Sequence, residues 1–189
     1  MKKILLLTFI YCIGSYKALA GSSIVLNPIE QAFPGKGPLG SGSLYAFIFK
    51  IYDIALWANS GECAKTFSCR MALQTLQNLG ASRKKLIEKT IEKICYYHPE
   101  LSSTDVKLYE EKLEALYPEK VGAGDIIQII CEPEKEGVIS FYYKAKENPD
   151  YILRGSVKDR KFSQYFFEIW LHPKSTYSKL RQNLLGESS

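Results

Sequence analysis

Histidine is scarce in this chain of 189 residues, and so are the local patterns that mark metal or catalytic sites. His98 and His172 are the only histidines and lie far apart in the sequence, and no CxxC pair occurs, so no zinc site is expected. No GxSxG segment offers a serine nucleophile. The GxGxxG match at residues 35–40 contains a proline and precedes a strand pattern instead of a helix, so we expect no nucleotide or other cofactor.

A large excess of charge of one sign is also missing. The 25 basic and 20 acidic residues give a formal charge of +5. Lys2, Lys3 and Lys17 lie in an N-terminal segment that we expect to be removed, and without them 22 basic and 20 acidic groups leave +2. A balance this close to neutral argues against nucleic acid as a partner.

Long hydrophobic runs are confined to the N-terminus. Two lysines precede an apolar run over residues 4–14, which is too short to span a membrane comfortably, and Ala18 and Ala20 form a small-x-small cleavage pattern. We predict a signal peptide over residues 1–20, a single domain over residues 21–189 and a periplasmic or secreted location. An uncleaved N-terminal anchor is the alternative, and no membrane span is expected after cleavage.

Four cysteines remain after the predicted cleavage site. Cys63 and Cys69 flank a short loop and are predicted to form a disulfide, which would persist outside the cytosol. Cys95 and Cys131 either pair with each other or stay as buried thiols, and the sequence leaves both possibilities open.

The most apolar part of the domain is residues 41–57, SGSLYAFIFKIYDIALW. Its aromatic and β-branched residues predict one long strand that is covered on both faces. Lys50, Tyr52 and Asp53 are polar within this run, so they are the first candidates for a binding site. Tyr45 and Tyr52 fall on opposite faces of such a strand, which would keep them from lining one cleft together.

The rest of the domain alternates between groups of strands and pairs of helices. Ser82 is a plausible N-cap for a helix that ends near His98, and Asp159 is one for a helix that Pro173 terminates. Because strands group with strands, the pattern predicts an α+β fold with an antiparallel sheet that carries helices on one face. The expected elements are strands at 71–79, 126–131, 138–144 and 151–157, helices from Ser82 and Ser103, and C-terminal helices from Asp159 and from Ser175 or Thr176.

Three segments resemble the chalcone isomerase-like proteins, in particular their secreted bacterial branch. They are GSGSLYAFIFKIYDIALW at 40–57, Gly124-Asp125 with CEPEKEGVISFYY at 131–143, and FFEIWLHPKSTYSKLRQNLLG at 166–186. The resemblance implies an open-faced β-sandwich, in which a large antiparallel sheet packs against a layer of helices and a ligand cleft lies between them. Some members close a flavanone ring with the help of an arginine, a threonine and a tyrosine, and others bind fatty acids.

This chain departs from the family at those polar positions. Ser43 stands where related sequences carry arginine, and Leu76 and Gln77 stand where a tyrosine is expected. We therefore expect a non-catalytic protein that binds a small apolar or amphipathic molecule such as a fatty acid, with Tyr45, Lys50 and Tyr52 as polar contacts. Two alternatives remain, namely a chalcone isomerase-type enzyme and an interaction module that binds a protein partner without a pocket.

Overall fold

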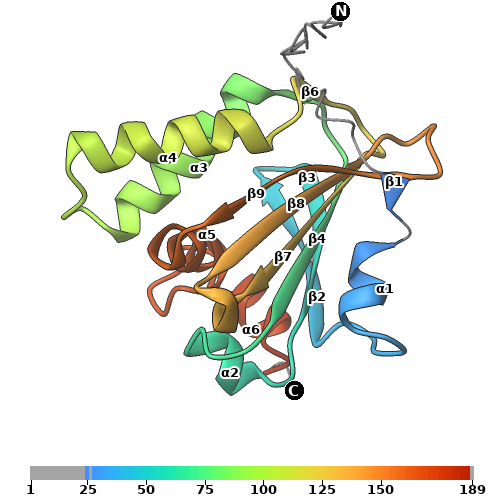
Figure 1. Ribbon diagram of the computed structural model, residues 1–189, viewed down its shortest axis with the longest axis horizontal. Coiled ribbons are helices and arrows are strands. Elements are labelled where there is room, and N and C mark those ends of the chain that lie inside the picture. Colours follow the sequence, from blue (N-terminus) through green and yellow to red (C-terminus); the bar gives the residue numbers. More distant parts are fainter. Residues whose placement is uncertain (1–23, 26, 188–189) are drawn as a thin grey trace, which may run out of the picture.

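The computed structural model describes residues 24–25 and 27–187, so the predicted signal peptide lies outside the described residues. Its centre is an antiparallel sheet with strand order β1-β9-β8-β7-β4-β3-β2 (Figure 1). The predicted α+β architecture with an antiparallel sheet is thereby confirmed. The strands are β1 (Ile24–Val25), β2 (Gly40–Ala46), β3 (Phe49–Trp57), β4 (Met71–Gln77), β7 (Ile126–Glu132), β8 (Val138–Lys144) and β9 (Tyr151–Lys158), with β5 (Ala81–Ser82) and β6 (Lys120–Val121) forming a separate pair.

Side-chain caps and prolines fix most of the helix ends. The Ser82 hydroxyl accepts a hydrogen bond from the Lys85 backbone N–H, and the Asp159 carboxylate accepts one from Phe162, as the sequence predicted. The last helix is an exception, because it begins at Ser178 and lacks a side-chain cap. The helices are α1 (Pro28–Ala32), α2 (Gly61–Lys65), α3 (Arg83–Tyr97), α4 (Ser103–Leu116), α5 (Arg160–Leu171) and α6 (Ser178–Leu184), with a 3₁₀ turn at Pro133–Lys135.

The prediction of one long strand over residues 41–57 is wrong. The chain reverses at Phe47 and Ile48, and β2 returns as β3 with Ala46 opposite Phe49. Phe47 takes a left-handed backbone conformation with φ 54°, which a tight reversal between two strands requires. This hairpin could not be recognised in the sequence, because its turn contains no glycine, asparagine or aspartate.

The two faces of the sheet are covered unequally. The main core lies between one face and helices α3, α4, α5 and α6, as expected for helices on one face. On the other face Ile29 of the short helix α1 and Phe33, directly after it, pack against Ala72 and Ile130 (Figure 1). Cover on both faces was expected for residues 41–57, but the sequence analysis predicted no helix on this side. Within the part of the chain that the structure describes, no helix is both long and apolar enough to cross a membrane.

The structure joins Cys63 to Cys69 by a disulfide across the loop that follows α2. Cys95 and Cys131 are not joined to each other, and each is a free thiol. Burial raises the pKa of the Cys131 thiol to about 12, because the thiolate would lose its hydration inside the core, so this thiol is protonated and unreactive.

Candidate functional site

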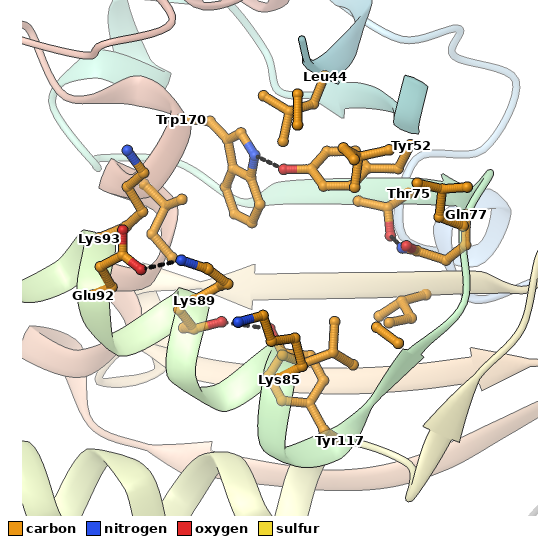
Figure 2. Close-up of a pocket in the computed structure, with 18 of the residues that line it drawn as sticks. Leu44, Tyr52, Thr75, Gln77, Lys85, Lys89, Glu92, Lys93, Tyr117 and Trp170 are labelled. Carbon is orange, nitrogen blue, oxygen red and sulfur yellow. Dashed lines mark hydrogen bonds and ion pairs between the residues drawn. The ribbon is translucent and has the colours of Figure 1, made fainter. Parts of the chain in front are cut away.

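A cavity of about 570 Å³ lies between the helix-facing side of the sheet and helices α3 and α5. Strands β2, β3, β4 and β7 form its floor, and Figure 2 shows the side chains that point into it. This volume lies within the range of roughly 300–1,000 Å³ that small-molecule sites occupy. Most of the wall is apolar, and its larger apolar members are Leu44, Ile51, Leu79, Leu86, Ile127, Ile129, Ile169 and Trp170.

Three polar side chains form a patch on the floor, which we call the polar patch: Tyr52, Thr75 and Gln77. Tyr52 on β3 lies directly opposite Gln77 on β4, and Thr75 precedes Gln77 by two residues, so all three share one face. The Gln77 Nε2 donates a hydrogen bond to the Thr75 Oγ1 at 2.9 Å. The contacts among the described residues give the Thr75 hydroxyl proton no acceptor, so the patch retains hydrogen-bonding capacity toward the cavity.

Tyr52 connects the polar patch to helix α5. The Trp170 indole Nε1–H donates a hydrogen bond to the Tyr52 hydroxyl oxygen at 2.8 Å (Figure 2). Burial raises the pKa of the Tyr52 phenol far above its usual value, and the bond from Trp170 only partly offsets that effect. Tyr52 is therefore a neutral phenol that can donate its own proton to a bound polar group.

A second buried polar pair lies at the α3 side of the cavity. The Thr90 and Tyr117 hydroxyls are 3.1 Å apart and hydrogen-bond each other. Burial raises the pKa of Tyr117 to about 12, against a smaller opposite effect of the Thr90 bond. Tyr52 and Tyr117 are thus uncharged, and neither can act as a base near neutral pH.

Among the residues that the structure describes, charged side chains line the cavity only where α3 borders it. Lys85, Lys89 and Lys93 follow one another at four-residue spacing, so they lie along one face of the helix. Lys85 pairs with Glu88 and Lys89 pairs with Glu92, whereas Lys93 donates to the Thr176 hydroxyl and lies over the Tyr177 ring. The mouth carries a small excess of positive charge.

The three residues expected to contact a ligand have different positions. Tyr52 lies in the polar patch, and Tyr45 lines the rim of the same cavity. The expectation that these two tyrosines could not share a cleft is wrong, because the hairpin turn and a register shift after Leu44 alter the alternation of a single strand. Lys50 is not among the residues lining the cavity, and its ammonium pairs with Asp53 at 2.6 Å.

Ser43 and Asp53 also lie outside the cavity lining, and they hydrogen-bond each other at 2.6 Å. Sequence reasoning named Gln77 only as a departure from the family and did not select Thr75 at all. The sequence contains one signal for this part of the site. One face of β4 changes from apolar to polar along the strand, through Met71, Leu73, Thr75 and Gln77. The change alone does not predict a cavity, because the pairing of β4 with β3 must also be known, and only the structure gives that pairing.

Comparison with known proteins gives a family and a fold. A family model described as chalcone isomerase-like matches residues 39–186. A fatty-acid binding protein of Arabidopsis thaliana has a similar structure, with a TM-score of 0.54 and 15% sequence identity. The match covers 87% of this chain and 96% of that one. No curated protein matches the sequence.

Proposed function

Because this chain belongs to the chalcone isomerase-like family, we propose that it is a non-catalytic protein that binds a single-chain amphiphile such as a fatty acid. The observation that carries the proposal is the polar patch inside an otherwise apolar cavity. An apolar chain would lie along the isoleucines of β7, while the polar end of the ligand would meet Tyr52, Thr75 and Gln77. The similar fold of a protein named for fatty-acid binding supports this assignment.

The chemistry of the cavity favours binding over ring closure. The described residues that line it include no arginine, and its lysines lie on α3 away from the polar patch. A phenoxide or an enolate placed beside the patch would face neutral hydrogen-bond donors without a cation to stabilise the charge. Neutral donors suit a fatty alcohol as well as a fatty acid, so we expect both to bind with affinities within about tenfold of each other.

We place the protein in the periplasm or outside the cell. This part of the proposal rests on the signal-peptide pattern of residues 1–20 and on a bond between Cys63 and Cys69, which an oxidising compartment would preserve. Fractionation of the native cells, with the reduced and oxidised masses of the protein measured in each fraction, tests the location.

Trp170 offers a direct test of binding, because it lines the cavity whereas Trp57 packs against the α1 layer on the other face. A brominated fatty acid is expected to quench the tryptophan fluorescence of Trp57→Phe and to leave that of Trp170→Phe largely unchanged. Equal quenching of both variants would contradict binding in this cavity.

A double variant locates the polar end of the ligand. Thr75→Val with Gln77→Leu removes both partners of one hydrogen bond and is expected to weaken fatty-acid binding by about tenfold or more. Leu76→Gln, on the exposed face of the same strand, is the matched control. If the double variant binds normally while Lys85→Gln with Lys89→Gln loses affinity, the polar end lies at the α3 lysines instead.

A further inference from the structure

The hairpin between β2 and β3 ends in an exposed apolar tip, which we define as Tyr45, Phe47, Ile48 and Phe49. Phe47 is 100% exposed and Ile48 is 85% exposed, while Phe49 and Tyr45 are 60% and 56% exposed. Single exposed apolar side chains are ordinary, but four of them on one protrusion mark a surface that meets an apolar partner.

The turn of the tip has an unusual residue at a strained backbone position. Phe47 has a φ of 54°, a region that glycine, asparagine and aspartate occupy at lower cost than a bulky residue. An aromatic residue in this position gains no burial that could offset its backbone strain, since its side chain is fully exposed. Strain of this kind is typical of functional segments.

The shape of the tip indicates what covers it. A groove on another protein would bury one side of a hairpin, whereas this tip projects apolar side chains from both strands and from the turn itself. Such a protrusion can bury apolar side chains on all of its sides when it enters the interfacial region of a bilayer, where aromatic residues are favoured.

The surroundings of the tip are consistent with a lipid surface. Tyr45, Lys85 and Lys89 all line the cavity, and more than half of each side chain is exposed, so the tip and these lysines border its opening to solvent. Lys85, Lys89 and Lys93 face two glutamate partners, which leaves an excess of one positive charge. Anionic headgroups would complement that excess, although the apolar tip would provide most of the binding.

We propose that the apolar tip docks into the surface of a phospholipid bilayer and holds the mouth of the cavity against the membrane. An amphiphile could then pass between the bilayer and the cavity without crossing water. That exchange rests on the binding function proposed above, whereas docking itself depends only on the tip and its surroundings.

Flotation with vesicles of phosphatidylethanolamine and a minority of phosphatidylglycerol tests the proposal. The test variant is Phe47→Gly with Ile48→Asn, which removes two apolar side chains and places glycine at the turn residue whose φ is positive, so it should fold. We expect its vesicle affinity to fall about 100-fold or more relative to the wild type. Leu108→Gln removes an exposed leucine on α4 and should bind vesicles like the wild type.

The outcomes separate docking from ligand binding. Loss of vesicle binding in the tip variant, with unchanged Trp170 quenching by a brominated fatty acid in solution, supports docking. Absence of vesicle binding by the wild type, or equal binding by the tip variant, overturns it. Self-association of the wild type that depends on the tip, without vesicle binding, would assign the tip to a second copy of the chain and also overturn the proposal. Failure of quenching alone affects only the proposed function.

Discussion

One face of the sheet contains two different regions, a densely packed one and a hollow one. In the packed region Phe141, Phe162, Phe166 and Phe167 are almost completely buried, and the Phe141 and Phe166 ring centroids are 5.1 Å apart in an edge-on arrangement. In the hollow region the same sheet face presents the polar patch to a cavity. Trp170 lies at the boundary, since its ring contacts Phe166 on one side and its indole N–H reaches Tyr52 on the other.

The packed and hollow regions meet within a single strand, β4. Along the helix-facing side of β4, Met71 and Leu73 are fully buried, and Thr75 and Gln77 follow them. The aromatic stripe of α5 recurs every four residues, and its Phe162 and Phe166 are fully buried in the core whereas Trp170 borders the cavity. A binding site is thus made by ending a well-packed layer early, not by adding a separate element.

The largest expected effect comes from opening the packed region. Phe166→Ala should lower the free energy of unfolding by about 3–5 kcal/mol, because it removes a fully buried ring and leaves a new void. Leu44→Ala only enlarges a cavity that already exists and should cost about 1 kcal/mol. Urea unfolding of both variants checks the contrast, and equal losses would show that the two regions are equally packed.

A smaller effect on the free energy of unfolding is expected at Asp125, which is hydrogen-bonded to Gln77 of the polar patch through its backbone. Its carboxylate accepts hydrogen bonds from the Tyr143 hydroxyl and from the backbone N–H groups of Gly122 and Lys146, and its own carbonyl accepts one from Gln77. Burial opposes ionisation of this carboxyl, but the three donors outweigh burial and hold the pKa of Asp125 below its usual value.

The sign of the pH effect follows from that direction. The folded-state pKa of Asp125 is lowered, so its contribution to stability is complete above the unfolded-state value of about 3.9 and disappears as the pH falls through the folded-state value. Asp125→Asn should cost about 1.5–3 kcal/mol near neutral pH and much less in acid. Unfolding curves at several pH values check this, and a constant difference between wild type and variant would contradict it.

Much of the fold could be predicted because its signals are local. Ser82 and Asp159 each cap a helix by a bond to a residue three positions later. Pro173 ends α5 because of its own ring, independently of tertiary contacts. The β2–β3 hairpin could not be predicted in this way. Its turn places Phe47 in a left-handed backbone conformation that glycine, asparagine and aspartate usually adopt. The apolar run therefore predicted one continuous strand.

A matched pair of enlargements tests the packing of the two regions. Ile139→Phe in the packed region should cost about 1–3 kcal/mol, because no space remains for the larger ring. Ile127→Phe points into the cavity and should change stability by less than about 1 kcal/mol while it weakens fatty-acid binding about tenfold or more. Thermal unfolding and Trp170 quenching measure the two effects, and unimpaired binding by Ile127→Phe would remove the ligand from this part of the cavity.

The candidate site was harder to predict than the fold, for a physical reason. Tyr52 is recognisable in the sequence as a polar residue in an apolar run, but its partners Gln77 and Trp170 are distant along the chain. Lys50 satisfies the same criterion, yet its charge is compensated by Asp53 outside the cavity lining. Strand register and helix packing decide between two such residues, and neither is encoded locally.

The smallest expected effect is at the boundary between the two regions. Tyr52→Phe deletes the acceptor of the Trp170 indole N–H and should cost about 1 kcal/mol, because this N–H would lose the hydrogen bond that it makes to Tyr52. The same variant should weaken fatty-acid binding several-fold, since the ligand loses a donor in the polar patch. Tyr117→Phe, which removes a hydroxyl bonded to Thr90, is the matched control for stability. If Tyr52→Phe lowers stability like the control but leaves binding unchanged, the hydroxyl only orients Trp170, and Thr75 with Gln77 would hold the polar end of the ligand.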